Sequence, residues 1–280
     1  MLSTNFAGSH FLALQLASHS RTLSIGEFHR LRRRGENRKE NCYRCGADAD
    51  CPVFRGLPGA PLPELYDRLF ENLATFRPGL ETVIDNSKKT EWAERYVGMP
   101  GYRQKYIHMI RDPRALVRRW IRTYERPSAK RQARWRTARK SGHFWKALTA
   151  PEGEVYLWKW LYQNRLITDF LKRCGGEHRV VTYHDLVFDQ ERVLKELTRW
   201  MGFEFEPSQR EYWKMEHHGS VKPDYMKAPD EGRIFDQRWK ADLDEETCRA
   251  ALAHQPIKAY LQGLGLRLDE ADGLVAQTGS

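Results

Sequence analysis

The chain has 280 residues, of which 40% are hydrophobic and 30% are charged. These proportions exclude an intrinsically disordered chain and are sufficient for one large domain with a buried core. The formal net charge of +10 favours anionic partners, such as a nucleotide, a sulfated or phosphorylated substrate, nucleic acid or a membrane surface. It does not choose among them.

The sequence contains no apolar run that approaches the length of a bilayer span, so we expect no transmembrane anchor. Residues Met1 to Phe6 have neither a basic stretch nor a long apolar stretch, so we expect no signal peptide. Five cysteines, an odd number, fit a reducing compartment better than a disulfide framework. We therefore expect a cytoplasmic protein.

Short β-type runs alternate with helical patterns along the chain. Strands separated by helices predict an α/β protein with a central parallel sheet flanked by helices, a three-layer, P-loop-like fold. In such sheets the ligand site lies at the carboxyl ends of the strands. The predicted strands are Leu2–Phe6, Thr22–Ile25, Glu81–Asp85, Tyr106–Ile110 and Arg179–Thr182, and the clearest helical stretches are Phe11–Ala17 and Val155–Leu171.

The chain has no internal repeat and no long Gly/Ser/Pro linker, so we expect residues 1–280 to form a single domain. The segment at about 35–63 is rich in Cys, Gly and Pro and is predicted to be an irregular insertion. The last dozen residues are mostly small and polar, which predicts a frayed tail.

The first candidate site is the stretch from Asn5 to His10, between a short strand and an apolar helix. Backbone N–H groups at a helix start bind anions when Gly8 permits close approach, and Ser9 and His10 add donors. An ordinary capped turn is the alternative interpretation. The stretch lacks the Gly-Lys-Ser/Thr ending of a Walker A loop, which argues against a Mg-nucleotide hydrolase.

The second candidate site is Arg111 to Arg114, directly after a predicted strand. Asp112 is a suitable helix cap and Pro113 suits the first helical turn. Arg111 would then lie at the end of the strand, where its guanidinium can hold a phosphate in a fork. Further arginines follow along the same helix, and a solvated basic helix is the alternative: Arg118, Arg119 and Arg122.

The third candidate site combines two strand ends. Glu27 follows the second predicted strand and Lys88 follows the third. A carboxylate and an ammonium that meet at one sheet edge match a general base and an electrostatic stabiliser. Each residue by itself is equally well explained as a surface side chain or a cap.

In this order, these stretches resemble the sulfotransferase family that uses 3′-phosphoadenosine 5′-phosphosulfate (PAPS), particularly its bacterial and tyrosylprotein-type branches. The resemblance covers most of the chain, and its motifs are specific as a set although each is weak alone. The stretches are STNFAGSHFLALQLASHS, GEFHRL, IDNSKK, IHMIRDPRALVRRW, VVTYHDLVFDQERVLKELTRWMGFEF and IFDQRW.

The resemblance implies a role for each matching residue. Glu27 would be the base that takes the proton of the acceptor, and Lys88 would stabilise the sulfuryl group in transfer, with His10 beside them. Donor-binding positions would be Ala7, Gly8, Ser9, His10 and Phe11 around the 5′-phosphosulfate, Arg111 and Arg119 at the 3′-phosphate, Tyr183 near the nucleotide and Arg233 as a late basic contact. The acceptor would be a hydroxyl or amine of a small molecule, carbohydrate or peptide, and no metal would be required.

Phe6 departs from the family pattern, because the family has Lys or Arg two residues before the loop glycine. Losing one such transition-state contact costs on the order of a hundredfold in rate; Lys88 or His10 would have to compensate. Two alternatives therefore stay open: a catalytically degenerate nucleotide- or anion-binding protein on the same scaffold, and a P-loop-type phosphotransferase. The chain also begins very close to the loop, which leaves a short first strand.

Cys42, Cys45 and Cys51 have partial zinc-ligand spacing, but the sequence indicates no fourth ligand. We favour reduced cysteines in a substrate-side loop, and a structural metal site is the alternative. His217 and His218 are adjacent and would point in different directions, so we do not expect them to bind one metal together; one could line the acceptor pocket.

The basic stretch Arg126 to Lys140 could bind nucleic acid, but we favour a solvated helix or a lid over an anionic acceptor. The aromatic residues Tyr156, Trp158, Trp160 and Tyr162 are predicted to pack a helix rather than to stack on bases.

Overall fold

A computed structural model describes the chain except for residues 34–41, 47–50, 220–222, 229–236 and 278–280. The described residues form two compact units, which we treat separately. Unit 1 comprises Met1, residues 9–92 and residues 189–230; unit 2 comprises residues 2–8, 93–188 and 231–280. The expectation of a single domain over residues 1–280 stays a prediction.

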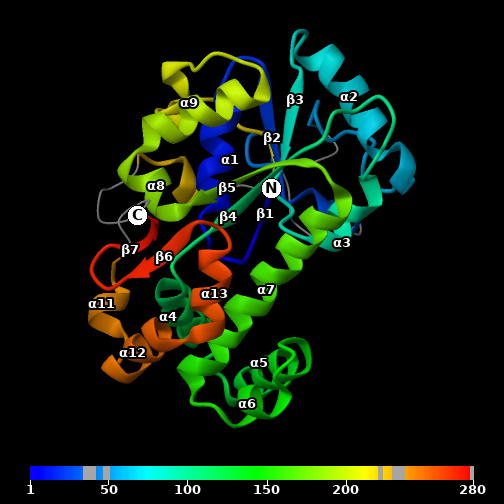
Figure 1. Ribbon diagram of the computed structural model, residues 1–280. Coiled ribbons are helices and arrows are strands. Elements are labelled where there is room, and N and C mark those ends of the chain that lie inside the picture. Colours follow the sequence, from blue (N-terminus) through cyan, green and yellow to red (C-terminus); the bar gives the residue numbers. More distant parts are fainter. Residues whose placement is uncertain (34–41, 47–50, 220–222, 229–236, 278–280) are drawn as a thin grey trace. The chain divides into compact units, whose positions relative to one another are not determined.

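Unit 2 is built on a parallel sheet of three strands in the order β1-β4-β5 (Figure 1). The strands are β1 (Leu2–Ser3), β4 (Lys105–Ile110) and β5 (Glu177–Thr182). β4 is the central strand and is almost entirely buried, which explains its continuous apolar sequence. Ile110 at the end of β4 lies opposite Thr182 at the end of β5, so the residues that follow both strands emerge at one edge.

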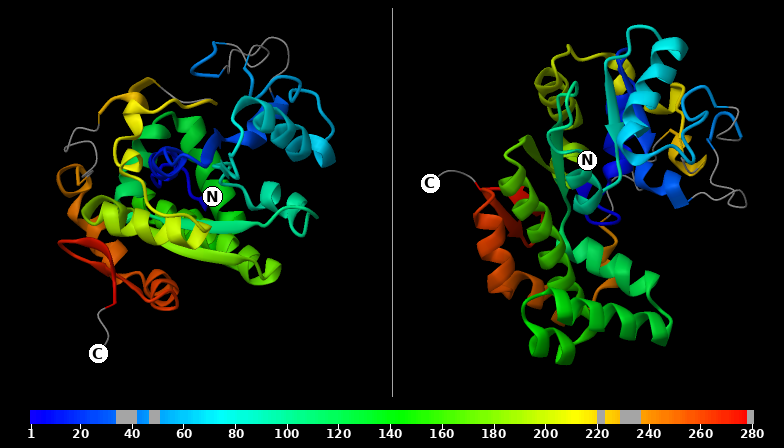
Figure 2. Two further views of the ribbon diagram at one scale, coloured as in Figure 1. Left: turned by 90° about the horizontal axis from the view of Figure 1, so that it is seen from above. Right: turned by 90° about the vertical axis from the view of Figure 1, so that its right-hand side faces the viewer.

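Helix α7 (Glu152–Cys174) packs against β1 and β4 and is the longest helix described (Figures 1 and 2). Its apolar positions contribute Tyr156, Trp158 and Trp160 to the main core cluster, as the sequence predicts. Helix α4 (Pro113–Thr123) packs on α7 and begins as expected, with the Asp112 carboxylate accepting from the Arg114 N–H and Pro113 in the first turn.

The remaining elements of unit 2 surround these helices. The basic stretch predicted as a solvated helix forms α5 (Pro127–Lys140), whose Trp135 is exposed and meets Phe144 edge to face. The other elements are η3 (Glu94–Tyr96), α6 (Phe144–Thr149), α8 (Tyr183–Phe188), α11 (Trp239–Asp242), α12 (Glu245–Ala253), α13 (Gln255–Gln262) and the antiparallel pair β6 (Leu266–Asp269) and β7 (Gly273–Ala276).

Unit 1 contains a parallel pair of strands, β2 (Thr22–Gly26) and β3 (Thr82–Asp85). Helix α1 (Ser9–Ala17) packs against both strands, and its side chains are almost all buried. The other elements of this unit are η1 (Phe28–Arg33), η2 (Leu62–Glu64), α2 (Leu65–Phe76), α9 (Gln190–Met201), η4 (Pro207–Gln209), η5 (Tyr212–Lys214) and η6 (Pro223–Met226); α3 (Thr90–Ala93) crosses from unit 1 to unit 2.

The predicted α/β class, with parallel strands flanked by helices, is confirmed, and each predicted strand is found within a few residues of its expected bounds. The first strand is the largest difference, because it ends at Ser3 and the loop begins at once. Of the expected insertion at about 35–63, residues 42–46 and 51–61 form turns, and residues 34–41 and 47–50 lie outside the described part of the chain. The extreme tail, 278–280, also lies outside it.

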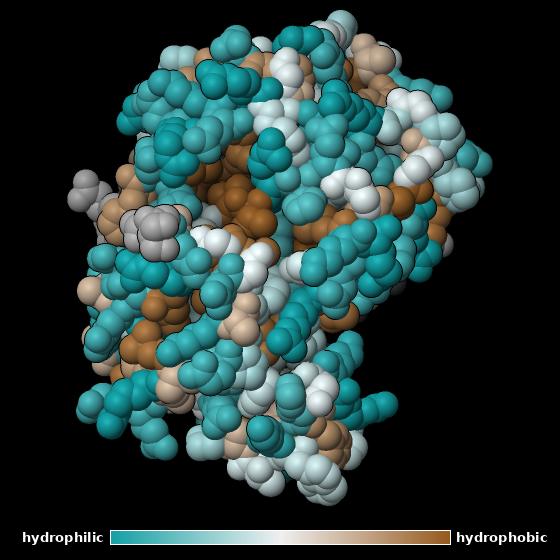
Figure 3. Space-filling model, viewed as in Figure 1, coloured by the Kyte–Doolittle hydropathy of each residue, from teal (hydrophilic) through white to brown (hydrophobic). Residues whose placement is uncertain are grey.

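Among the described residues, no helix combines the length and the apolar character that a bilayer crossing requires. The face drawn in Figure 3 is mostly hydrophilic, in keeping with a chain in which 30% of residues are charged.

Candidate functional site

The ends of β2 and β3 bring Glu27 and Lys88 together, as the sequence predicts. Gly26, the last residue of β2, pairs with Asp85, the last residue of β3, after a register shift in β2. The Nζ atom of Lys88 lies 2.5 Å from Oε1 of Glu27. Both side chains are largely buried, with 8% and 13% of their surface exposed, so the ion pair is well shielded from solvent.

A hydrogen-bonded turn after β3 holds Lys88 in position. The Asp85 carboxylate accepts from the backbone and hydroxyl of Ser87 and from the side chains of Tyr66 and Trp92. Lys88 itself has a φ of +64°, a left-handed conformation that is uncommon for a residue with a side chain. Such conformations persist where the surroundings determine them, and they occur often at functional sites.

Glu27 accepts from three donors. Besides Lys88, Nε2 of His10 lies 3.1 Å from Oε1, and Nε of Arg30 lies 2.5 Å from Oε2. His10 belongs to the first turn of α1, so the start of that helix lies beside the carboxylate. The ring of Tyr225 stacks on His10 at 5.8 Å between centroids.

These contacts determine which groups are charged. Burial alone would raise the pKa of Glu27, but the hydrogen bond from His10 and the charges of Lys88 and Arg30 hold that pKa well below its ordinary value. Burial lowers the pKa of His10 below 6.5, although Glu27 opposes the shift. At neutral pH the centre therefore contains an ionised carboxylate that accepts from a neutral imidazole.

The other predicted residues of α1 have mixed surroundings. Ser9 is buried at the start of the helix, and the first turn contains no acidic residue that would repel an anion. Phe11 packs edge to face on Tyr212 at 5.6 Å. Phe11 therefore packs inside unit 1, and its predicted position beside the bound nucleotide rests on the family resemblance alone.

In unit 2, Arg111 is fixed against the loop that precedes α1. Its Nη1 donates to the carbonyl of Phe6 at 2.9 Å, and its guanidinium lies 4.1 Å from the centre of the Tyr183 ring. Gly8 has a φ of +95°, and a Cβ atom built there would meet Tyr183 Cδ2 at 2.4 Å. Ala7 is fully buried, and its N–H points to the carbonyl of Thr4. The loop thus requires glycine at position 8, where it passes under Tyr183.

Of the arginines that follow, Arg119 contacts this loop; its guanidinium lies 4.8 Å from the centre of the Phe6 ring. Arg114 and Arg118 are almost fully buried in ion pairs with Asp112 and Asp242, so they are structural. They are not part of a solvated basic face, because each carboxylate partner neutralises its arginine inside the unit.

A pocket opens beside Arg111, entirely within unit 2. Its walls include Tyr183, His184 and Phe188 from α8, Trp239 from α11 and Gly273 from β7. Aromatic walls with an arginine at one side suit a flat base that carries a phosphate. Arg233, the expected late basic contact, lies outside the described residues, as do the first three residues of the IFDQRW stretch.

The sequence does not predict three residues that lie around Glu27, Lys88 and His10: Arg30, Asp85 and Tyr225. Arg30 could have been found, because it follows Glu27 by three residues on a short helical turn. Tyr225 has no comparable signal, because it reaches His10 from more than 200 positions along the chain.

The structure brings a candidate fourth ligand to the three cysteines, one that the sequence does not indicate. His218 lies against Cys42, Cys45 and Cys51, and the four potential ligand atoms are within 4.8 Å of one another. His217 instead bonds to the Tyr212 carbonyl at 2.8 Å and is buried, so it belongs to the packing of unit 1.

The sequence matches no protein-family model and no curated protein. The structure, however, is similar to solved sulfotransferase domains. One, from the curacin biosynthetic pathway, has 20% sequence identity and a TM-score of 0.56, with 89% of this chain and 94% of that chain covered. Another, from the Synechococcus PCC 7002 olefin synthase, has 17% identity and a TM-score of 0.61, with 90% and 92% covered. The chain therefore has the fold of these sulfotransferase domains.

Proposed function

We propose that the protein is a sulfotransferase that moves a sulfuryl group from PAPS to a hydroxyl or amine of a small-molecule, carbohydrate or peptide acceptor. The observation that carries this proposal is the contact between Glu27 and Lys88 beside the first turn of α1. It unites a proton acceptor, a cation and a helix start, which are the groups that sulfuryl transfer needs. The fold similarity supports the same conclusion.

The residues present suit PAPS as the sulfuryl donor. PAPS supplies an already activated sulfuryl group, so the protein has to bind, orient and stabilise charge. The backbone N–H groups at the start of α1, with the Ser9 hydroxyl, would hold the 5′-phosphosulfate. Arg111 would bind the 3′-phosphate, and the pocket next to it, with Tyr183 in its wall, would take the adenosine.

In the reaction, the acceptor oxygen or nitrogen forms a bond to sulfur while the bond from sulfur to the bridging oxygen of the donor breaks. The acceptor proton passes to Glu27, and adenosine 3′,5′-bisphosphate leaves. Lys88, buried next to Glu27, stabilises the negative charge that develops on the transferring group.

The groups that donate hydrogen bonds to Glu27 limit how this carboxylate can act as a base. A carboxylate with a lowered pKa is ionised at neutral pH but is a weak base. The acceptor hydroxyl must therefore replace one of the contacts to Glu27, and Lys88 can then turn toward the sulfuryl group. His10 would keep Glu27 oriented while the contacts change, because His10, like Lys88, contacts Oε1 of Glu27.

The absence of a basic residue at position 6 is the main reason to consider a degenerate scaffold. Arg119, which the resemblance assigns to the 3′-phosphate, offers a replacement in this different role, since its guanidinium stacks on the Phe6 ring and carries a positive charge to that part of the loop. We propose that Phe6 and Arg119 together do what a single loop cation does in the family. A phosphotransferase is less well supported, because the loop lacks the Walker lysine.

Transfer from PAPS labelled with ³⁵S tests the proposal. The wild-type chain is incubated with mixtures of hydroxyl and amine acceptors, and labelled products are separated from the donor. Wild-type transfer that is absent in Glu27→Gln supports the proposed reaction. Tight binding of adenosine 3′,5′-bisphosphate without any labelled product, across small-molecule, carbohydrate and peptide acceptors, would instead favour the degenerate scaffold.

A further inference from the structure

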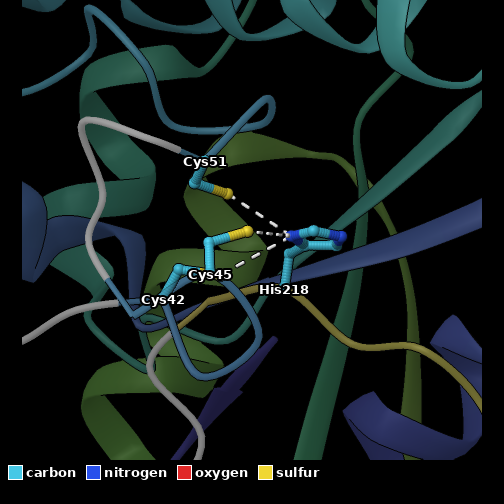
Figure 4. Close-up of side chains that lie close together, drawn as sticks. All are labelled: Cys42, Cys45, Cys51 and His218. Atoms are coloured by element: carbon cyan, nitrogen blue, oxygen red, sulfur yellow. Dashed lines mark hydrogen bonds between the residues drawn. The ribbon is translucent and has the colours of Figure 1, made fainter.

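The cluster formed by Cys42, Cys45, Cys51 and His218 lies within unit 1 and contains none of the residues assigned to the proposed reaction. The three cysteines come from the turns after η1, and the histidine follows η5 (Figure 4). Cys42, Cys51 and His218 are 1%, 0% and 3% exposed, and Cys45 is partly exposed. We propose that this cluster is a structural binding site for one Zn²⁺ ion.

The distances from His218 to the three sulfurs fit tetrahedral coordination. Nδ1 of His218 lies 3.5, 3.6 and 3.3 Å from Sγ of Cys42, Cys45 and Cys51. Bond lengths of about 2.3 Å for Zn–S and about 2.1 Å for Zn–N place a sulfur and a nitrogen ligand about 3.6 Å apart in a tetrahedron. The three side chains converge on the same ring nitrogen, so one ion could contact all four ligands (Figure 4).

The backbone around the first two cysteines forms a tight turn. The N–H of Gly46 donates to the Cys42 carbonyl at 2.9 Å, and Gly46 has a φ of +79°. The N–H of Gly219 points to Sγ of Cys42 at 3.5 Å. A backbone donor at a sulfur stabilises a thiolate, which is the form that binds zinc.

The environment of His218 also favours a metal ligand. Its second nitrogen, Nε2, lies 3.3 Å from Oε1 of Glu216, within the distance of an ion pair but without the geometry of a hydrogen bond. Phe76 packs edge to face on the other side of the ring at 4.9 Å between centroids. The imidazole is thus held with Nδ1 toward the sulfurs, as a Cys₃His zinc site requires.

The ion would connect this cluster to the candidate site. Gly219, next to His218, has a φ of +106° and approaches the backbone of Ile25, two residues before Glu27. Fixing His218 to the three cysteines therefore fixes the segment that packs on the end of β2. The zinc would position Glu27 without contacting the substrate.

Metal content tests this inference independently of any activity. The untagged wild-type chain, desalted under reducing conditions, should contain one zinc ion per molecule. Cys51→Ser and His218→Ala should lose most of it. Cys248→Ser and His217→Gln are the matched controls, because Cys248 and His217 lie outside the cluster, and both should retain the wild-type zinc content.

A second measurement does not depend on how the variants fold. Adding Co²⁺ to the metal-free wild-type chain should produce the visible bands and thiolate charge-transfer absorption of a tetrahedral site, and zinc should displace them. Wild-type protein that contains no zinc and gives no cobalt spectrum would overturn the proposal. So would full zinc content in folded Cys51→Ser.

Discussion

The ammonium of Lys88 lies 2.5 Å from the carboxylate of Glu27, although the two residues are 61 positions apart and follow different strands. The contact exists because β2 and β3 run parallel and end together. Lys88 also keeps a left-handed backbone there, held by the turn that Asp85 organises. The two side chains form the centre on which the proposed transfer depends.

Glu27→Gln should abolish sulfuryl transfer while adenosine 3′,5′-bisphosphate still binds. The amide keeps the shape of the side chain but cannot accept the acceptor proton, so kcat should fall by about a hundredfold or more. Steady-state kinetics and calorimetry on the same preparation check both parts. Glu81→Gln is the control, because Glu81 is a half-exposed partner of Arg21 in the same unit. Unchanged turnover in Glu27→Gln would remove Glu27 from the role of base.

Lys88→Met should lower kcat by about a hundredfold, because it removes a cation that stabilises the transition state. It should also change the pH profile. The charge of Lys88 helps to lower the pKa of Glu27, so its loss raises that pKa. Since the base must be ionised, the acid limb of the kcat profile should move to higher pH. In Lys88→Arg the positive charge remains, so the acid limb of the kcat profile should stay close to that of wild type. If the acid limb lay at the same pH in wild type, Lys88→Met and Lys88→Arg, the charge of Lys88 would have no effect on the pKa of Glu27.

Gly8→Ala should destabilise the protein more than Gly142→Ala. Both glycines have positive φ values, but an added Cβ meets Tyr183 at position 8 and no atom within 4 Å at position 142. The left-handed backbone costs about 1 kcal/mol at either site, and the clash adds about 1–3 kcal/mol at position 8. Urea unfolding measures the difference. Equal free energies of unfolding would mean that Tyr183 does not cover the loop.

Stability should decrease in mild acid because of His108. This residue is 1% exposed in β4, and burial lowers its pKa to about 4, although Asn164 opposes the shift. The unfolded chain binds a proton near pH 6.5 and the folded chain does not, so the stability present above that pH is lost as pH falls toward 4.

The loss between pH 6.5 and 5 is at most about 2 kcal/mol for one such histidine. His108→Gln can keep a hydrogen bond to Asn164 without titrating, so it should lose less stability over this range. Urea unfolding at pH 7 and pH 5 compares the two proteins. Identical losses would show that His108 does not contribute.

The parts of the site that follow from local sequence could be predicted. Short β-type runs between helical patterns predict the strands. Because parallel strands end at the same edge of a sheet, the sequence also predicts that Glu27 and Lys88 meet. Contacts between distant segments could not be predicted. His218 reaches Cys51 across 167 positions, and Asp242 reaches Arg118 across 124. The hydrophobic pattern of a sequence does not indicate which distant side chain completes a set of metal ligands or neutralises a buried arginine.

The role of Arg111 follows from its fixed position at the loop. Replacing it with Ala removes a guanidinium that we expect to form charge-assisted hydrogen bonds with a phosphate, so affinity for the nucleotide should fall by about tenfold or more. Arg122→Ala is the matched control, because this arginine lies on α4, the helix that begins two residues after Arg111, and is largely exposed.

Calorimetric titration with adenosine 3′,5′-bisphosphate tests the central claim most directly, because it requires no knowledge of the acceptor. We predict one site with a micromolar or tighter dissociation constant in the wild-type chain and in Arg122→Ala, and clearly weaker binding in Arg111→Ala. Absence of binding at micromolar concentrations by the folded wild-type protein would contradict the proposal that this chain is a PAPS-dependent sulfotransferase.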